Sequence, residues 1–576
     1  MKASQIRNQI VRKLNKIYKP NYSNNELKIY LEDIIQAIKK SNLIKNKNKS
    51  FDLSEKTSLL ICYGDSVLGT KNSRSIKELK KFYLKFLSKY FNTVHFLPFY
   101  PSSSDSGFAV KDHYKIDPRL GKWSDIKNFS KKSHIMADVV INHSSSRGLW
   151  FKNYLKNKSP GKNYFFTIDK KFNSTNVVRP REHPLLKKIN IFNKNQYLWR
   201  TFSDDQIDLN FKNPKVLIRF IKIIINLINH GVNIFRLDAI AYLWKENGTK
   251  CINLNQTHEI IKIIRIVCNS LNKSAIIVTE TNLPENENIS YFGTNDEANW
   301  IYNFSLPPLL VHSLLFEDSR KLSVWSKKLP QAKIGNSYLN FIASHDGIGM
   351  RPVEGLLNKD AINKMFKRLK KNGGEFSFRK VQGKSKKVYE ANITLFNAFH
   401  KTDIDPKGKY HYARYLCAHA IMISFEGIPA VYFNSMFGTS NDINKFIISN
   451  NKRDLNRYKW SAERLNKSLK NKNSKHYLIY EEITNLLSIK QKNKAFHPNA
   501  LRKTINLGPK IFAFKRISLD KKQTVMCISN LSSKTQSIKF QLKNKKHREL
   551  IIGTTVSKNN IALDPFQTIW LSSYNL

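Results

Sequence analysis

The sequence contains no apolar run that could cross a membrane. A spanning helix needs about 18 or more largely apolar residues, and no stretch of the 576 residues reaches that length. The first residues, MKASQIRNQIVRKL, carry charges where a secretory signal peptide has its apolar block. We therefore expect a cytoplasmic protein with no membrane partner.

Cysteine is scarce, and its spacing indicates neither a disulfide framework nor a zinc site. The five cysteines are odd in number, widely scattered and never spaced as CxxC. This usage fits a reducing compartment, in agreement with the cytoplasmic expectation.

Acidic residues are also few, with 43 Asp and Glu against 98 Lys and Arg, which leaves a net charge of +55. Such an excess is typical of nucleic-acid-binding proteins. Here it is spread along the whole chain, and no helix-turn-helix, RNP-like or Cys/His finger pattern occurs. We interpret it as a compositional bias, compatible with an anionic small substrate, and predict no specific nucleic-acid partner.

A hydrophobic content of 41% and an aromatic content of 12% predict a folded globular protein. Residues 1–50 read as helices, because apolar residues recur at three- and four-residue spacings between Leu27 and Ile38. The polar stretch that ends at Ser50 separates this helical segment from the main domain.

Short apolar runs alternate with helical stretches from residue 51 to about residue 489. Eight such repeats predict an α/β protein whose parallel strands close into a (β/α)8 barrel. The predicted strands are residues 58–63, 93–100, 134–143, 232–239, 275–280, 300–304, 338–346 and 428–434.

Two connections are too long for simple crossovers and predict insertions. Residues 144–208 follow the third strand, and residues 349–410 follow the seventh. Loops after barrel strands line the catalytic face, so both insertions should shape the pocket. Residues 490–576 instead show alternating apolar runs with polar turns, which predict a small antiparallel β domain.

Charged residues interrupt the fourth predicted strand, in the stretch GVNIFRLDAIAY. Arg236 and Asp238 are two residues apart, so a strand projects both to the same face. Opposite charges on the inner face of a core strand are costly unless they pair or take part in chemistry. A purely structural ion pair is the alternative.

Other strands carry polar groups at the same end. The third ends in DVVINH with His143, the fifth in VTE with Glu280, and the seventh leads into ASHDGIG with His345 and Asp346. A lone His143 could be a satisfied core histidine, but barrel enzymes hold their catalytic groups at these strand ends.

Three carboxylates at one barrel mouth suggest chemistry on glycosides. Retaining glycosyl transfer needs one ionised carboxylate and one protonated carboxyl, roughly 5 Å apart. Arg236 should keep Asp238 ionised, and the less compensated Glu280 should hold a proton near neutral pH.

In order and spacing, DVVINH, FRLDA, TE and ASHD resemble the four sequence regions of the α-amylase superfamily of glycoside hydrolases. The resemblance implies that Asp238 is the nucleophile, Glu280 the acid/base and Asp346 the third carboxylate, which stabilises the transition state. It further implies sugar-binding and orienting roles for Arg236, His143 and His345.

Further stretches resemble the sucrose phosphorylase branch of that superfamily. In LPFYPSSSDSGFAVKDHYKIDPRLG and KRDLNRYKW, the resemblance implies that Asp105 and Arg453 bind the donor glucose. In this branch, phosphate rather than water resolves the glucosyl-enzyme. The implied partners are a small-molecule α-glucoside and inorganic phosphate, and the implied assembly is a monomer or homodimer.

Acceptor recognition should lie in the insertions. VVRPREHPLL carries Arg179 and Arg181, which could bind phosphate or a carboxylate or could be solvated surface arginines. VYEANITLFNAF matches the loop that places a tyrosine, here Tyr389, near phosphate. Glu390 stands where sucrose phosphorylases have Gln, so this loop is more similar to glucosylglycerate phosphorylases.

Three alternatives remain open at this point. They are a sucrose phosphorylase, an α-glucosidase or transglucosidase of the same barrel, and a non-catalytic nucleic-acid- or sugar-binding protein. We predict no metal and no cofactor. Asn142 matches a calcium-ligand position of amylases, but the first insertion has no acidic cluster that would complete a site.

Overall fold

The computed structural model describes residues 3–42, 51–169, 171–191, 194–380, 386–539, 547–556 and 560–574. Eight parallel strands form a closed barrel in which neighbours along the chain are neighbours in space, and the last strand pairs with the first. This confirms the predicted fold class. The strands are β1 (Leu59–Cys62), β2 (Thr93–Phe96), β3 (His134–Val140), β9 (Ile234–Asp238), β10 (Ile276–Thr279), β11 (Trp300–Tyr302), β12 (Ser337–Asn340) and β16 (Ile428–Tyr432).

The barrel strands are buried almost throughout, because side chains fill the interior and helices cover the outside. One of these helices is α6 (Pro214–Asn229), with eleven buried residues. Its start is defined by Pro214 at the first helical position and by the Asn213 side chain, which accepts a hydrogen bond from the Lys215 backbone N–H.

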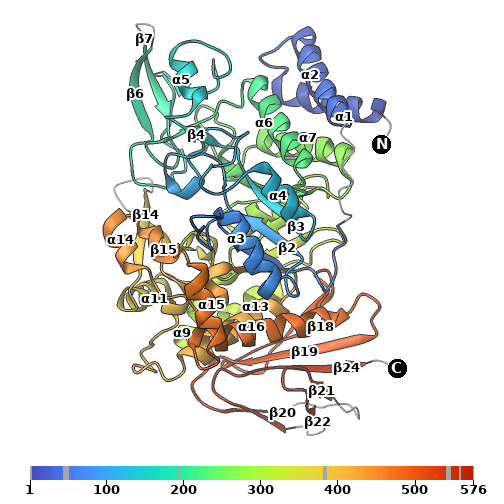
Figure 1. Ribbon diagram of the computed structural model, residues 1–576, viewed down its shortest axis with the longest axis vertical. Helices are drawn as coiled ribbons and strands as arrows, with labels where there is room; N and C mark the ends of the chain where they lie inside the picture. Colours follow the sequence, from blue (N-terminus) through green and yellow to red (C-terminus); the bar gives the residue numbers. More distant parts are fainter. Residues whose placement is uncertain are drawn as a thin grey trace.

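Two N-terminal helices, α1 (Ala3–Tyr18) and α2 (Asn24–Asn42), pack against α6 and α7 (Asn255–Leu271) on one side of the barrel (Figure 1). Lys13 and Lys16 of α1 both donate to the Glu259 carboxylate of α7, at 3.0 and 2.6 Å. The Tyr18 hydroxyl donates to a backbone carbonyl oxygen that precedes α6. These contacts attach the helical segment to the barrel.

Insertions follow the third and seventh barrel strands, as predicted. Between β3 and β9 lie α5 (Leu149–Leu155), the pair β4 (His143–Ser145) and β8 (Gln206–Asp208), and the sheet of β5 (Thr167–Ile168), β6 (Leu186–Ile191) and β7 (Lys194–Trp199). After β12, the strands β13 (Ile348–Gly349), β14 (Glu375–Lys380) and β15 (Lys386–Asn392) form an antiparallel sheet, with α11 (Lys359–Lys371) between its first two strands.

The C-terminal region forms antiparallel sheets at the opposite end from β6 and β7 (Figure 1). Its strands are β17 (Leu501–Ile505), β18 (Ile511–Ile517), β19 (Gln523–Asn530), β20 (Gln536–Lys539), β21 (His547–Glu549), β22 (Thr555–Val556), β23 (Asn560–Leu563) and β24 (Thr568–Tyr574). The alternating pattern of residues 537–542 also predicts a strand, and residues 540–542 of it lie outside the described residues. The domain boundaries near residues 50 and 489 stay predictions.

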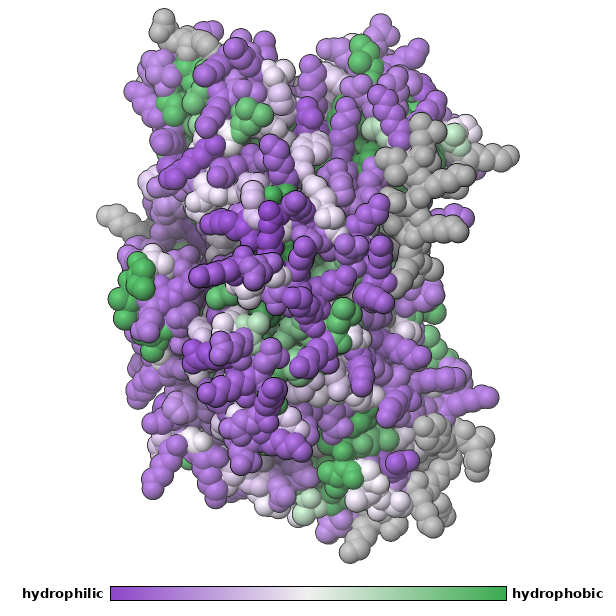
Figure 2. All heavy atoms as spheres, in the orientation of Figure 1, coloured by the Kyte–Doolittle hydropathy of each residue, from purple (hydrophilic) through white to green (hydrophobic). Residues whose placement is uncertain are grey.

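The surface agrees with the even spread of charge along the chain. Hydrophilic side chains cover most of the face in Figure 2, and apolar groups on it are scattered. Among the described helices, none combines the length and the apolar character needed to span a bilayer.

Candidate active site

One cavity at the carboxyl ends of the barrel strands gathers eleven of the twelve predicted site residues. Arg179 is not among the lining residues, and its guanidinium donates to the carbonyl oxygen of His183 within the first insertion. The prediction that Arg179 binds substrate therefore has no support from its position. The eleven that line the cavity are Asp105, His143, Arg181, Arg236, Asp238, Glu280, His345, Asp346, Tyr389, Glu390 and Arg453.

The centre of the site is the buried end of β9. Arg236 Nη1 donates to Oδ1 of Asp238 at 2.8 Å and also contacts Asp138 of the neighbouring strand β3. Its Nη2 lies 4.0 Å from Oε2 of Glu280. One guanidinium thus lies within 4.0 Å of three carboxylates, because β3, β9 and β10 are adjacent in the barrel.

A left-handed backbone conformation adds a backbone N–H donor to this group. Ala239, the residue after Asp238, has a φ of 53°, and its N–H donates to Oε2 of Glu280 at 2.9 Å. Positive φ is unfavourable for a residue with a side chain and is found disproportionately at functional sites. The strained turn links the two carboxyls that the sequence assigned to catalysis.

Arg236 lowers the pKa of Asp238, as expected, but its effect is not the largest one. Burial and the nearby carboxylates outweigh the arginine, so the pKa of Asp238 is raised. Burial likewise raises the pKa of Glu280, against the opposing effects of Arg236 and the Ala239 N–H. The expectation from the sequence left out burial, which has the largest effect on the pKa of both groups. Near neutral pH the two carboxyls can therefore retain one proton between them.

The hydrogen bonds favour Glu280 as the carboxyl that holds this proton. Asp238 accepts a charge-assisted hydrogen bond from Arg236, which stabilises its ionised form. Among the described residues, Glu280 accepts a hydrogen bond only from the neutral Ala239 N–H, and it lies farther from the guanidinium. The arrangement therefore suits an ionised Asp238 beside a protonated Glu280.

The pair of His95 and Asp138, which contacts Arg236 through Asp138, was not predicted from the sequence. His95 Nε2 lies 2.9 Å from Oδ2 of Asp138, and both side chains are buried. Burial lowers the pKa of His95, which keeps the imidazole neutral near pH 7. A polar residue within the apolar strand TVHF was the available signal, and His95 also lines the cavity.

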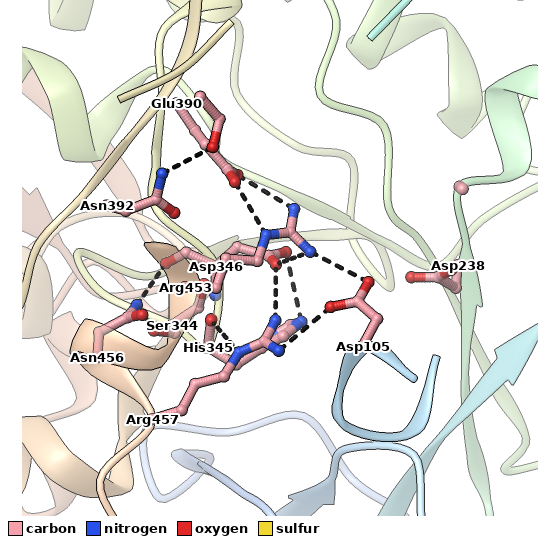
Figure 3. Close-up of polar contacts among 12 residues, drawn as sticks. Asp105, Asp238, Ser344, His345, Asp346, Glu390, Asn392, Arg453, Asn456 and Arg457 are labelled. Carbon is pink, nitrogen blue, oxygen red and sulfur yellow. Dashed lines mark hydrogen bonds and ion pairs between the residues drawn. The ribbon is translucent and has the colours of Figure 1, made fainter. Parts of the chain in front are cut away.

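A second charged group lies across the opening from Asp238 (Figure 3). Arg453 Nη1 lies 2.9 Å from Oδ1 of Asp346 and 3.5 Å from Oδ2 of Asp105. Arg457, four residues further along, reaches Oδ1 of Asp105 at 3.2 Å and donates to the His345 carbonyl oxygen at 2.9 Å. Sequence analysis named Arg453 but not Arg457 of the same KRDLNRYKW stretch.

These arginines determine the ionisation of their carboxylate partners. Burial raises the pKa of Asp346, but Arg453, His345 and Arg457 outweigh it, so the net pKa is lowered. Arg453 and Arg457 likewise overcome the burial of Asp105 and lower its pKa. Both carboxylates are therefore anionic at neutral pH and can accept hydrogen bonds from sugar hydroxyls.

The two predicted histidines are neutral donors or acceptors at the wall of the cavity. Burial lowers the pKa of His345 to about 3, and its ring stacks on Phe108 with centroids 4.9 Å apart. His143 Nε2 lies 3.1 Å from the carbonyl oxygen of Phe108, and burial lowers its pKa as well. Each has a buried Nδ1 without a hydrogen-bond partner among the described residues.

The insertion after β12 supplies the far wall of the cavity. Glu390 of β15 accepts both Nε and Nη2 of Arg453, at 2.9 and 3.2 Å, so its carboxylate is directed at this arginine. The preceding Tyr389 lies under the guanidinium of Arg181, whose carbon is 4.7 Å from the ring centroid. The first insertion, which carries Arg181, and β15 therefore meet at the cavity.

A buried lysine lies at the amylase-like calcium position. Lys245 Nζ donates to Oδ1 of Asn142 at 3.1 Å and pairs with Oδ2 of Asp208 at 2.8 Å. The ammonium thus ties the end of β3 to the insertion strand β8. It already provides a positive charge at this position, while the prediction that no metal binds stays a prediction.

A closed parallel barrel that gathers carboxylates, arginines and histidines at its strand ends defines the class of (β/α)8-barrel enzymes. The family model described as alpha amylase, catalytic domain, matches residues 79–352. The chain is 32% identical to a glucosylglycerate phosphorylase of Escherichia coli, over 94% of this chain and 96% of the relative. It is 26% identical to a sucrose phosphorylase of Agrobacterium vitis, over 71% and 83% of the two chains.

Among solved structures, the sucrose 6F-phosphate phosphorylase from Thermoanaerobacter thermosaccharolyticum has the same fold. The TM-score is 0.72 at 23% identity, with 88% of this chain and 98% of that chain covered. The protein belongs to the alpha-amylase family of enzymes, and within it to the group that includes the glucoside phosphorylases.

Proposed function

We propose that this protein is a retaining phosphorylase that transfers the glucosyl group of 2-O-α-glucosylglycerate to inorganic phosphate. The observation that carries the proposal is the similarity to a glucosylglycerate phosphorylase along nearly the whole chain, which exceeds that to a sucrose phosphorylase in both identity and coverage. The products would be α-glucose 1-phosphate and glycerate.

In the first step, a carboxylate oxygen of Asp238 attacks C1 of the glucosyl group and forms an ester bond. Glu280 gives its proton to the glycosidic oxygen as the C1–O bond breaks, and glycerate leaves as a free hydroxy acid. The hydrogen-bond pattern, with Arg236 on Asp238 and a neutral N–H on Glu280, supports this division of roles.

In the second step, an oxygen of hydrogen phosphate attacks C1 from the side that glycerate left. Glu280, now ionised, accepts the phosphate proton, and the ester bond to Asp238 breaks. Two inversions at C1 give retention, so the product is the α-anomer. Asp346 and Asp105, held by Arg453 and Arg457, are placed to bind the glucosyl hydroxyls.

The reaction is tested by measuring glucose 1-phosphate with phosphate present, offering glucosylglycerate and sucrose in separate reactions. Product from glucosylglycerate is the expected result. Product from sucrose alone would mean that the family assignment holds but the acceptor has been misread. Free glucose formed without any dependence on phosphate would instead identify a hydrolase.

A further inference from the structure

The loop that carries Asp105 has a strained backbone. Three consecutive residues of this loop (residues 102–110, the Asp105 loop) have a positive φ, namely Asp105 at 50°, Ser106 at 49° and Gly107 at 113°. Glycine fits at the third position, where a Cβ would lie 2.6 Å from the carbonyl oxygen of Pro98. The other two residues have side chains, and such a conformation persists only where surrounding structure holds it.

One carboxylate of the first insertion accepts hydrogen bonds from this loop. Ser104 Oγ donates to Oδ2 of Asp205 at 2.7 Å, and Ser103 Oγ donates to the same oxygen. Both serines stand directly before Asp105 in the chain. The loop is therefore fixed at the point where its backbone enters the left-handed conformation.

The other oxygen of Asp205 binds the segment that follows the third barrel strand. Ser146 Oγ donates to Oδ1 at 2.7 Å, and the Ser146 N–H donates to the carbonyl oxygen of Asp205 at 2.8 Å. Ser145 Oγ lies 3.3 Å from Oδ1 and 2.6 Å from Ser103 Oγ, and it can donate to either. Burial raises the pKa of Asp205, but the serine hydroxyls outweigh it and lower the net pKa, so the carboxylate is anionic at neutral pH.

The segments joined at Asp205 also carry side chains that line the cavity. Asp105 follows Ser104 directly, and His143 lies two residues before Ser145. Phe202 and Gln206, which flank Asp205 in the sequence, line the cavity too. Asp205 itself is not among the lining residues, so its effect on a bound sugar would pass through these neighbours.

The arginines alone do not determine where the Asp105 carboxylate lies. Arg453 Nη1 is 3.5 Å from Oδ2 of Asp105, and Arg457 Nη1 is 3.2 Å from Oδ1 (Figure 3). Both distances exceed the roughly 2.7–2.9 Å of a strong charge-assisted hydrogen bond. Arg453 is also shared with Asp346 and Glu390. The position of this carboxylate therefore depends on the backbone of its loop.

We propose that Asp205 is a positioning residue for the glucosyl side of the reaction, because it holds the Asp105 loop in its left-handed conformation. This inference rests on the proposed function, in which Asp105 binds a hydroxyl of the glucosyl group. Without the Asp205 carboxylate, the hydroxyls of Ser103, Ser104 and Ser146 lose their acceptor and the loop relaxes. Asp105 then moves relative to the sugar, and a displacement of about 1 Å can cost about hundredfold in rate.

Deoxygenated α-glucosyl fluorides, each lacking one hydroxyl, test the inference when their kcat/KM is compared with that of the parent fluoride. The hydroxyl that Asp105 binds is the one whose removal lowers kcat/KM of the wild type about tenfold or more but has little further effect in Asp105→Ala. In Asp205→Ala, the penalty for losing that same hydroxyl should be at least about fivefold smaller than in the wild type. Asp205→Asn, which keeps one accepting oxygen, should restore part of the penalty.

Asp204→Ala is the matched control, because Asp204 is the adjacent residue, is exposed and pairs with Arg200. It should leave the penalty within about twofold of wild type. An equal loss of kcat/KM for all fluorides in Asp205→Ala, with the penalty unchanged, would show a purely structural role and overturn the inference. Failure of Asp105→Ala to single out any hydroxyl would overturn it as well.

If Asp205→Ala does not fold, Ser104→Ala decides, because it removes one hydrogen bond between the loop and Asp205. A smaller penalty for the same hydroxyl supports the inference, and an unchanged penalty refutes it. Fluoride release is measured throughout and does not depend on the acceptor. A wild type that releases fluoride but forms no glucose 1-phosphate therefore refutes the proposed function, while the comparison of penalties still tests Asp205.

Discussion

Glu390 occupies the position at which this chain departs from sucrose phosphorylases, and its contacts predict how it acts. The carboxylate holds Arg453 through two hydrogen bonds, and Arg453 in turn contacts Asp346 and Asp105. Glu390 should therefore act on the glucosyl side of the reaction through Arg453, as a positioning residue, and should not discriminate between acceptors.

Glu390→Gln removes the charge and replaces one acceptor oxygen by a donor NH2 group. One of the two hydrogen bonds to Arg453 is then lost, and a hydrogen bond to a charged group contributes about 1.5–3 kcal/mol. If that energy is felt in the transition state, kcat/KM should fall about tenfold to hundredfold. The fall should be equal for glucosylglycerate and for α-glucosyl fluoride, whose leaving group has no carboxylate.

The assay is phosphate-dependent release of glucose 1-phosphate from each donor. Glu354→Gln is a matched control, since Glu354 accepts from the buried Arg379 in the same region but does not line the cavity. It should change turnover of the fluoride by less than about threefold. A loss confined to glucosylglycerate, with fluoride turnover intact, would refute the reasoning and show that Glu390 reads the acceptor.

Asp238→Ala should abolish glucose 1-phosphate formation while circular dichroism stays native, and measurable turnover at the wild-type rate would exclude the nucleophile role. The raised pKa of Glu280 implies that activity on glucosylglycerate falls as pH rises through that pKa, because the protonated form is needed. α-Glucosyl fluoride, whose departure needs no proton, should lose most of this alkaline limb in a pH–rate profile. Lys245→Met should lower the free energy of unfolding by about 3–5 kcal/mol, because Asp208 loses its buried cation. Urea titration measures this loss, and chelators should leave the wild-type Tm unchanged.

The barrel and the mouth of the site could be predicted from the sequence because both follow from local pattern. Apolar runs mark the strands, and polar residues such as Asp238 and Glu280 stand where those runs end. Parallel strands bring those ends together whatever the intervening chain does. The resemblance to known sequence regions added the roles, but the positions were already visible.

The pairing of arginines with carboxylates in the site could not be predicted, because it depends on contacts between segments that are distant in the sequence. Burial, together with Glu280 and with Asp138, which lies 98 residues before Arg236 in the chain, outweighs Arg236, so the net pKa of Asp238 is raised. Glu390 binds Arg453 from a distance of 63 residues. The periodicity of apolar residues does not predict which carboxylate an arginine will contact, and the net charge of the chain does not predict individual ion pairs.

The glucosyl side and the acceptor side of the cavity differ in whether their arginines are paired with carboxylates, and this difference fits the proposed ligand of each side. A glucosyl group is neutral, so the arginines on its side can be paired with carboxylates such as Asp105 and Asp346, which in the proposed reaction accept hydrogen bonds from the sugar hydroxyls. In the proposed reaction an acid and phosphate, both anions, alternate on the other side, where Arg181 lines the cavity and has no carboxylate within salt-bridge distance among the described residues. When one anion replaces the other, the positive charge on this side has a partner in both steps of the reaction. A neutral aglycone would leave that charge unpaired in the first step. Glu390 faces Arg453 for the same reason. A carboxylate turned toward the acceptor side would repel both the acid and the phosphate, because all three carry negative charge.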